Sequence, residues 1–527
     1  MTYFEWSWSG PTWNLVIAVI LLAFMYMVWC YTFFLRRNIP GPVPLPIFGN
    51  ALEWRKGIHL ALDDYIQKYG SGCGFYKFFY PSILVSDPET IKQIMVKHFD
   101  RFSNREPIPL DNPNMDKALF LSSDDLWRKI RHTLTPAFSG RKMKLMSLMV
   151  NEPADRLLQN FKTIYEKSNG VFECRELYGA YVIDTIALCA FGLHVDSQRN
   201  KNHPFVTNAK RFFASLDFTS PAMILSTIIP GAGKILKWLG LSVFPEDVIA
   251  FFKAVVDEAV DNRKSTNDKT RLDFLQLMID AAEEDDGDDD GDGGEDLGSR
   301  STNRSTTESK TKREPLTRQE LTSQALAFFF AGYETTSSAI SFASYLLATH
   351  PEEQDRLIDE IDRLAPSRDD VTYETMKSLT FLDNVINEAL RLYPPGAIFD
   401  RICARTTVIG DRVFPAGASV TFNVWSTHRD PEFWPNPEKF DPDRFSKENR
   451  AKRHPFAHLP FGGGPRVCIG LRFAVMEIKT ALVRVLQEFR LEVTSATEIP
   501  PEFGKMGFIF PPKGITLRVV PREDDRT

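Results

Sequence analysis

The stretch "HLPFGGGPRVCIGLRF", residues 458–473, places a cysteine between a glycine-rich loop and an apolar run with helical spacing. Gly462, Gly463 and Gly464 allow the backbone to turn with positive φ or to approach a flat group closely. Cys468 precedes the expected helix, whose N-terminal dipole favours a negatively charged sulfur. This environment suits a metal-binding thiolate, although a structural cysteine in a Gly-rich turn is the alternative.

A lone thiolate does not suit zinc, which takes four protein ligands in structural sites. It does suit the axial position of a haem, because the porphyrin already supplies four ligands to the iron. The spacing F-x-x-G-x-R-x-C-x-G is complete, with Phe461, Gly464, Arg466, Cys468 and Gly470. This spacing resembles the haem-binding signature of the cytochrome P-450 superfamily. The resemblance covers nearly the whole chain from residue 40. It looks closest to the clan of liver drug- and steroid-oxidising P-450s and thromboxane synthase.

The resemblance implies a fold and a cofactor. We expect a mainly α protein with the cytochrome P-450 fold, in which an α-rich domain with a minor β region follows an N-terminal transmembrane helix. We expect haem b (iron protoporphyrin IX), with Cys468 as the axial ligand of its iron. The residues expected to hold this cofactor are Arg105, Trp127, Arg131, Arg401, Phe461 and Arg466. For Arg105 and Arg401 an ordinary surface arginine is the alternative.

A second motif supports the fold rather than the chemistry. "EALR" sets Glu388 and Arg391 three residues apart, where opposite charges meet on a helix. "FDPDRF" adds Arg444 about 50 residues later. In the resembled family such a Glu–Arg–Arg set is a buried structural network, and removal of one partner would leave an unpaired buried charge. An isolated surface pair is the alternative for "EALR" alone.

The run "AFFFAGYETTSS" predicts the middle of a long helix. Gly332 costs about 1 kcal/mol in a helix interior relative to Ala, so we expect a packing or ligand-binding reason for it. The hydroxyls from Thr335 onward can bond back to carbonyls and open the helix locally. The resemblance implies that Glu334 and Thr335 lie over the haem and help to protonate dioxygen. The alternative is a helix with a patch of small residues.

Apolar residues on both sides of this motif predict a lipophilic substrate pocket. Phe330 and Ala331 precede Gly332, and Ala397 and Ile398 follow "YPPG". Consecutive helical residues point about 100° apart, so only part of the phenylalanine run can face one site. The apolar stretch 222–241 could contact a bilayer, and core packing is the alternative.

Length and composition indicate a globular protein with an anchor. The 527 residues are 43% apolar and 25% charged, and the net charge is −6. Ten acids and no base lie in 283–296, so the rest of the chain is net basic. The six cysteines form no CxxC pair, which excludes a disulfide framework and favours a reducing compartment. We divide the chain into an N-terminal segment with anchor (1–35), a basic, proline-rich hinge (36–50) and a catalytic domain (51–527), with a disordered acidic and polar loop at 283–312.

The anchor is the uncharged run from Leu15 to Leu35, whose 21 residues suffice to cross a bilayer as a helix. A cleaved signal peptide usually has a basic n-region and small residues at the cut site, and neither is present. Arg36 and Arg37 follow the run, so the positive-inside rule leaves the catalytic domain in the cytosol. With the family resemblance, this predicts a single-pass protein of the endoplasmic reticulum membrane.

Helix and strand signals complete the prediction. T-x-x-E at Thr317 and Glu320 predicts a capping box for a helix that reaches Thr349, and Pro351 predicts the start of the next helix. The segments "FRLEV", "MGFIF" and "GITLRVVP" predict short C-terminal strands.

The resemblance implies a monooxygenase that inserts one atom of O2 into a lipophilic substrate of the xenobiotic, steroid or fatty-acid class. The chain carries no G-x-G-x-x-G or P-loop pattern, so we expect a separate NADPH-dependent flavoprotein reductase. Basic residues expected near the thiolate side, such as Lys129, Lys452 and Arg453, are candidates for docking it, and a plain solvated surface is the alternative. Other expected partners are membrane lipid and the lipophilic substrate, and no nucleic acid. The alternatives are a thromboxane-synthase-like isomerase of a lipid endoperoxide and a haem carrier without turnover.

Overall fold

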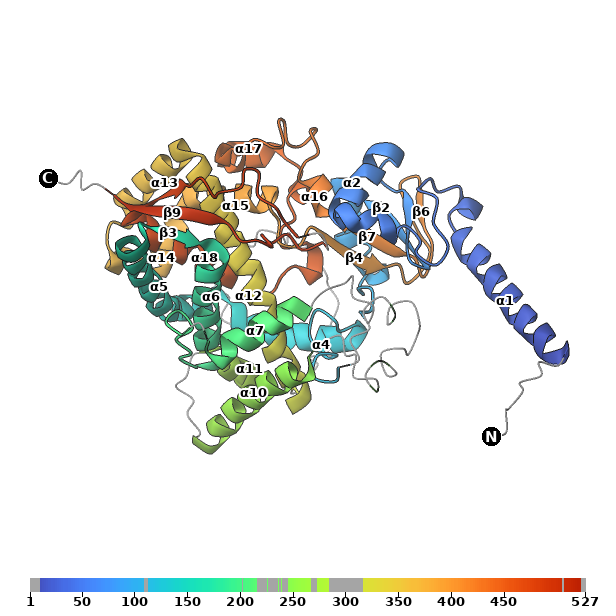
Figure 1. Ribbon diagram of the computed structural model, residues 1–527, viewed down its shortest axis with the longest axis horizontal. Helices are drawn as coiled ribbons and strands as arrows, with labels where there is room; N and C mark the ends of the chain where they lie inside the picture. Colours follow the sequence, from blue (N-terminus) through green and yellow to red (C-terminus); the bar gives the residue numbers. More distant parts are fainter. Residues whose placement is uncertain are drawn as a thin grey trace, which may run out of the picture.

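A computed structural model of the chain describes residues 10–522, apart from 109–111, 201, most of 216–244, 267–272, 284–315 and 505–506. The expected acidic loop at 283–312 lies outside the described residues, apart from Glu283 at the end of a helix. Most of the apolar stretch 222–241 also lies outside them. The fold is mainly helical, as predicted, and the longest helix runs through the middle of the molecule (Figure 1).

The described helices before this central helix include an isolated N-terminal one and several that pack together. They are α1 (Gly10–Tyr31), α2 (Ile58–Tyr69), α3 (Pro88–Lys92), α4 (Asp124–Leu134), α5 (Gly140–Ser168), α6 (Cys174–Phe191), α7 (Pro204–Ser215), α10 (Glu246–Thr266) and α11 (Phe274–Glu283). The central helix and those after it are α12 (Arg318–Thr349), α13 (Pro351–Leu364), α14 (Tyr373–Ser378), α15 (Thr380–Leu392), α16 (Val424–Thr427), α17 (Lys447–Lys452) and α18 (Leu471–Leu486).

The capping box predicted for α12 is present. The hydroxyl of Thr317 accepts from the N–H of Glu320, and the Glu320 carboxylate accepts from the N–H of Thr317 at 2.8 Å. The helix ends at Thr349, and α13 begins at Pro351, both as predicted. Because α12 packs against α6, α15 and α18, it supplies a rigid, mostly buried element beside which a site can be built.

The strands form three small sheets. The largest has the order β1 (Gly74–Lys77), β2 (Tyr80–Val85), β7 (Ser419–Asn423) and β4 (Ile398–Ile402), in which only β2 and β7 are parallel. The others are β3 (Val171–Glu173), β9 (Thr516–Pro521) and β8 (Phe489–Val493), and the pair β5 (Thr407–Ile409) and β6 (Arg412–Phe414).

Two of the three C-terminal strand predictions are confirmed. "FRLEV" forms β8 and "GITLRVVP" contains β9. In the described part of "MGFIF" the pairing is limited to a bridge between Gly396 and Phe508. The strand prediction for "MGFIF" was therefore wrong. The segment pairs with the residues just before β4 instead of extending a sheet, since Ala397 N–H donates to Gly507 O at 2.9 Å and Ile509 N–H donates to Pro395 O at 3.0 Å.

The N-terminal helix α1 projects away from the domain, on the side opposite the C-terminus (Figure 1). Residues Trp13–Tyr31 are apolar and long enough to cross a membrane, and almost all of this segment lies outside the packed interior of the protein. The helix ends at Tyr31, four residues earlier than predicted, because Phe34 turns back into the domain. The Phe34 ring is buried against Tyr76, with ring centroids 5.0 Å apart. The Gly74 N–H also donates to Pro40 O at 2.8 Å, so residues after the anchor lie against β1.

Candidate functional site

The cysteine loop, residues 459–470, connects a short turn to the start of α18. Cys468 N–H donates to Phe461 O at 3.0 Å, and Val467 N–H donates to Gly464 O at the same distance. Gly464 has a φ of 65°, in the left-handed region. A Cβ atom there would lie 2.3 Å from the carbonyl oxygen of Met95. The loop conformation that presents Cys468 therefore depends on glycine at position 464.

The Cys468 thiol has free surface, yet burial within the protein is the largest influence on its pKa and raises it. The N–H groups of Gly470 and Leu471 and the charges of Arg131 and Arg105 act in the opposite direction and lower this pKa. We infer that the thiol faces a space inside the protein rather than bulk water, since both observations then hold. The nearby positive charges and backbone donors favour a thiolate there.

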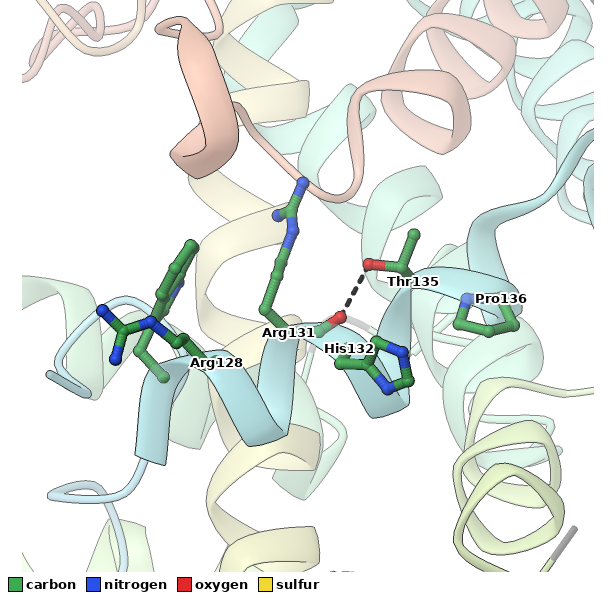
Figure 2. Close-up of a pocket in the computed structure, with 6 residues that line it drawn as sticks. Arg128, Arg131, His132, Thr135 and Pro136 are labelled. Atoms are coloured by element: carbon green, nitrogen blue, oxygen red, sulfur yellow. Dashed lines mark hydrogen bonds between the residues drawn. The ribbon is translucent and has the colours of Figure 1, made fainter. Parts of the chain in front are cut away.

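Arginines from distant segments converge on this loop. Arg131 extends from α4 toward it, as Figure 2 shows, and its Nη1 donates to Val467 O at 3.0 Å. Arg466 donates to Ser122 O at 2.9 Å, and its guanidinium lies 4.4 Å from the ring centroid of Trp127. The structure thus brings the predicted Trp127, Arg131 and Arg466 together around Cys468.

The predicted Arg105 and Arg401 belong to the same cluster. Burial lowers the pKa of Arg401 to about 9, and repulsion from Arg105 and Arg466 adds to this effect. The Nε atoms of Arg105, Arg401 and Arg466 are buried without a hydrogen-bond partner. Within the described part of the chain, no carboxylate forms an ion pair with these three guanidinium groups. The charge of the Asp400 carboxylate favours the charged form of all three arginines, but burial outweighs it, because the pKa of each still lies below its usual value. Buried cations with so little opposing charge are costly. The propionates of a haem would supply the missing negative charge, so this cluster fits the expected cofactor.

The shape of the loop fits a flat group as well. A Cβ atom at Gly462 or Gly470 would meet nothing within 4 Å, whereas Gly463 and Gly464 pack tightly against Phe456 and Met95. The open sides of Gly462 and Gly470 flank Cys468 in the sequence. Glycine is thus used in two ways here, for close packing on one side and for open space on the other.

The predicted acid and hydroxyl on α12 point in different directions. The Thr335 hydroxyl donates back to Ala331 O at 2.7 Å, and Ala331 and Thr335 form one face that has free surface on an otherwise buried helix. Glu334 is buried and lies 2.8 Å from Nη2 of Arg175 on α6. This contact is an ion pair without well-directed hydrogen bonds, since neither Glu334 oxygen has a hydrogen-bond partner.

Two expectations for this helix have a clear outcome. The helix stays continuous from Arg318 to Thr349, so the predicted local opening after Gly332 was wrong. The hydroxyl groups bond back to carbonyls without breaking the backbone ladder, because the helix is packed on most of its faces. Gly332 has a packing reason, since a Cβ atom there would lie 2.8 Å from Cδ1 of Ile186 on α6.

The four predicted pocket residues differ in accessibility. Ala331 is exposed and Ile398 is half-buried, whereas Phe330 and Ala397 are buried. The Phe330 ring stacks on Phe212 of α7, with ring centroids 3.4 Å apart. Ala397 is held by backbone hydrogen bonds to Gly507 and Trp425. In this structure Phe330 and Ala397 are therefore packed within the protein and have little free surface.

The predicted Glu–Arg–Arg contacts form. Glu388 accepts two hydrogen bonds from Arg391, at 2.7 Å and 2.8 Å, and both side chains are fully buried. Arg444 Nε lies 3.3 Å from Glu388 Oε1. Burial raises the pKa of Glu388, and its bonds to Arg391 act in the opposite direction. The network joins α15 to the segment that precedes the cysteine loop.

Sequence reasoning missed two residues that contact this machinery. Arg175 pairs with Glu334 from 159 positions earlier, and His428 contacts the first residue of the cysteine loop. No local motif marks either residue. Only the strong helix pattern around Gly332, which demands a close neighbour, could have indicated that α6 lies beside Glu334.

Comparison with known proteins agrees with this geometry. The family model for cytochrome P450 matches residues 39–519. The chain is 38% identical to cytochrome P450 3A40 of Oryzias latipes over 515 residues, which cover 98% of both chains. It is 37% identical to cytochrome P450 3A9 of Rattus norvegicus over 523 residues and to cytochrome P450 3A6 of Oryctolagus cuniculus over 519 residues, again covering 98% of each chain. The chain therefore belongs to the cytochrome P450 family, whose members bind haem through a cysteine thiolate, and it is a haem-dependent monooxygenase.

Proposed function

We propose that Cys468 is the axial thiolate ligand of haem b and that the convergent cations hold the haem propionates. The observation that carries this proposal is the cluster of Arg105, Arg401 and Arg466 beside the thiol. Their Nε atoms are buried without a hydrogen-bond partner, and the three side chains form no ion pair among the described residues. Arg131 and Trp127 complete this set, and Phe461 fixes the loop through its carbonyl. Bound haem supplies the activation of dioxygen, and thiolate ligation favours O–O cleavage.

The chain's own residues manage protons. Thr335 lies on the face of α12 that has free surface, and its hydroxyl is fixed by the bond to Ala331 O. Glu334 begins from the ion pair with Arg175. We propose that Glu334 and Thr335 hand protons inward, which requires the Glu334 side chain to turn from Arg175 toward Thr335. Glu388, Arg391 and Arg444 have a structural role.

The substrate class follows from the residues around this face. Ala331 and Ile398 offer apolar surface, and Phe330 and Ala397 add buried apolar packing. A lipophilic substrate of the xenobiotic, steroid or fatty-acid class fits such a lining. The relatives' names state no substrate, so this class rests on the residues and on the family.

Electrons must arrive from a separate NADPH-dependent flavoprotein reductase. Of the predicted docking residues, Lys129 forms an ion pair with Glu320 at 3.1 Å, and Arg453 lies 3.8 Å from the ring centroid of Trp434. Both are engaged within the chain, whereas Lys452 is exposed. The outer surface of α4 is a better centre for docking. It carries an open hollow of about 380 Å³ (Figure 2), lined by Trp127, Arg128, Arg131, His132, Thr135 and Pro136.

This docking surface is connected to the proposed ligand. Arg131 lines the hollow and donates to Val467 O, one residue before Cys468. Arg128 and His132 on the same helix are exposed and basic, and Arg128 forms an ion pair with the exposed Asp125 at 2.6 Å that an acidic partner would have to replace. A partner with acidic residues would therefore approach the thiolate side of the haem through α4.

The proposed location is the endoplasmic reticulum membrane. The segment 1–35 contains α1 as a single-pass anchor, residues 36–50 connect it, and 51–527 form the cytosolic catalytic domain. Support comes from the apolar residues Trp13–Tyr31 and from Arg36 and Arg37 directly after them. Membrane lipid is thus a proposed partner of α1.

Turnover of purified, haem-loaded protein tests this function on a lipophilic panel that includes a prostaglandin endoperoxide. Each reaction runs with and without reductase, NADPH and dioxygen. The proposal expects product only when all three are present, and loss of that product in Thr335→Ala. Rearranged endoperoxide formed without NADPH, and indifferent to Thr335, would establish the isomerase instead. Binding without turnover under every electron supply would indicate a carrier.

A further inference from the structure

His428 lies in the interior between the ion-pair network and the cysteine loop. Its side chain is fully buried. Nδ1 lies 3.1 Å from Arg391 O, and Nε2 lies 2.7 Å from the N–H nitrogen of Leu459. A backbone N–H can only donate and a carbonyl can only accept. The ring is therefore neutral, with the proton on Nδ1 and the acceptor lone pair on Nε2.

The two residues that bond the imidazole, Arg391 and Leu459, are each held by further hydrogen bonds. Arg391 forms the two-bond ion pair with Glu388, and its Nη1 donates back to His428 O at 2.9 Å. Leu459 is buried, and its carbonyl accepts from Gly462 N–H at 3.0 Å. The imidazole thus joins a rigid ion pair to the first residue of the cysteine loop.

A neighbouring histidine packs against the ring but does not provide a second acceptor for Leu459. His428 stacks on His458, with ring centroids 5.1 Å apart and an interplanar angle of 25°. His458 bonds Asn387 O at 3.2 Å and does not contact Leu459 N–H through its ring nitrogens. If His428 were absent, the Leu459 N–H would be a buried donor without an acceptor, which is costly.

We propose that His428 is a positioning residue for the haem ligand: it transmits the fixed position of Arg391 to Leu459 and so sets where the cysteine loop places Cys468. This rests on the proposed role of Cys468 as the axial ligand. The Glu388–Arg391 pair would then be connected to the cysteine loop by two hydrogen bonds of the His428 imidazole, one to Arg391 O and one from the Leu459 N–H.

Three substitutions in the full-length, haem-loaded protein test the proposal. His428→Phe keeps the ring shape and removes the acceptor. His428→Gln replaces the ring nitrogen with a carboxamide oxygen that can still accept from the Leu459 N–H. His458→Phe is the matched control, because it changes the stacked neighbour and leaves the Leu459 contact intact. The readout is the absorption of the reduced carbon monoxide complex, which distinguishes a thiolate from a thiol ligand, followed over time together with haem content.

The proposal expects His428→Phe to lose the thiolate absorption about tenfold faster than the unsubstituted protein, a factor that corresponds to about 1.4 kcal/mol for the orphaned donor. His428→Gln and His458→Phe should resemble the unsubstituted protein. Equal rates in all four proteins would overturn the proposal, and so would equal losses in both Phe variants, which indicate general core damage. If His428→Phe does not accumulate, His428→Asn replaces it: it is too short to keep the bond, and must be less persistent than His428→Gln.

The same data separate this inference from the proposed function. If the unsubstituted protein shows no thiolate absorption, Cys468 is not the ligand and the proposed function fails. If it shows that absorption and the variants do not differ from it, only the role of His428 fails.

Discussion

The Glu334 carboxylate on α12 lies 2.8 Å from the Arg175 guanidinium on α6, while the adjacent Thr335 bonds the helix backbone on another face. The acid and the hydroxyl therefore do not touch each other. Arg175 also lies 5.0 Å from the ring centroid of Phe510, so its position depends on the C-terminal segment as well. This arrangement makes Arg175 a candidate control on when Glu334 is available.

Substitution of Arg175 should alter proton handling more than binding. Arg175→Leu removes the ion pair that fixes the resting position of Glu334, so proton delivery should no longer be controlled. A well-placed acid contributes about 10²–10⁴-fold to a rate, and we therefore expect a shifted pH profile of product formation and about tenfold more peroxide released per NADPH. Arg175→Lys retains the positive charge, so its peroxide yield and pH profile should lie between those of the unsubstituted protein and Arg175→Leu. An unchanged pH profile and unchanged peroxide yield in Arg175→Leu would contradict this role.

The buried ion pair should be far more sensitive than an exposed one. Arg391→Met leaves Glu388 buried without its two-bond partner, and we expect a loss of about 3–5 kcal/mol in unfolding free energy. The matched control is Arg356→Met, which removes an exposed pair with Asp443 at 2.8 Å and should cost about 0–1 kcal/mol. Denaturant unfolding followed by haem release measures both. Similar losses of unfolding free energy in Arg391→Met and Arg356→Met would show that the buried network stabilises the fold no more than an exposed ion pair does.

Gly464 should not tolerate a side chain. In Gly464→Ala the Cβ would lie 2.3 Å from Met95 O in a backbone with positive φ, so the loop must shift. We expect low haem content in the purified protein. Gly396→Ala serves as control, since a Cβ there meets nothing within 4 Å and the φ is not positive. Full haem loading of Gly464→Ala would argue against the loop geometry described here.

Acid should destabilise the fold through its buried histidines. Burial lowers the pKa of His458 to about 3, and the charges of Arg450, Arg453 and Arg391 add to this effect. Burial also lowers the pKa of His428 well below its ordinary value of 6.5, with repulsion from His458 and Arg391 acting in the same direction. The unfolded chain then binds more protons, so stability is complete above about pH 6.5 and falls between there and pH 3. His458→Phe should reduce the loss between pH 7 and 5.5 by about 1 kcal/mol in urea unfolding. A pH dependence identical to that of the unsubstituted protein would refute this.

A buried acid on α18 should act with the opposite sign. Both carboxylate oxygens of Glu477 are buried without a partner in the described structure, and burial raises its pKa well above 4.5. Because the folded protein holds this proton more tightly than the unfolded chain, stability is highest below about pH 4.5 and falls as the pH rises and the carboxyl ionises in the unfolded chain. Glu477→Met should therefore stabilise the protein at pH 8 by at least about 1 kcal/mol and lose this advantage in acid. Destabilisation at pH 8 would mean that Glu477 has a role the contacts do not reveal.

The sequence carried enough information for local features and for the ligand loop. The Thr317 cap, the start at Pro351 and the glycines before Cys468 depend on a few neighbouring residues, so their patterns predict the structure directly. The family spacing also placed Arg105 and Arg401 beside Arg466, which local rules could not do.

Features that depend on packing between distant segments could not be predicted. The predicted anchor ran to Leu35, but the helix ends at Tyr31 because Phe34 is buried against Tyr76. The hydroxyls after Gly332 suggested a break that the neighbouring helices do not allow. The contacts of Arg175 and His428 cross more than 30 positions of sequence, and no periodicity encodes them.

The central claim is that Cys468 supports oxygen insertion fed by a reductase. The most direct measurement is product formation by haem-loaded protein with reductase, NADPH and isotopically labelled dioxygen, followed by mass spectrometry. The account predicts one labelled oxygen atom per product molecule, and no labelled product from Cys468→Ser. Product that carries no label from dioxygen, or that forms equally in Cys468→Ser, would contradict it.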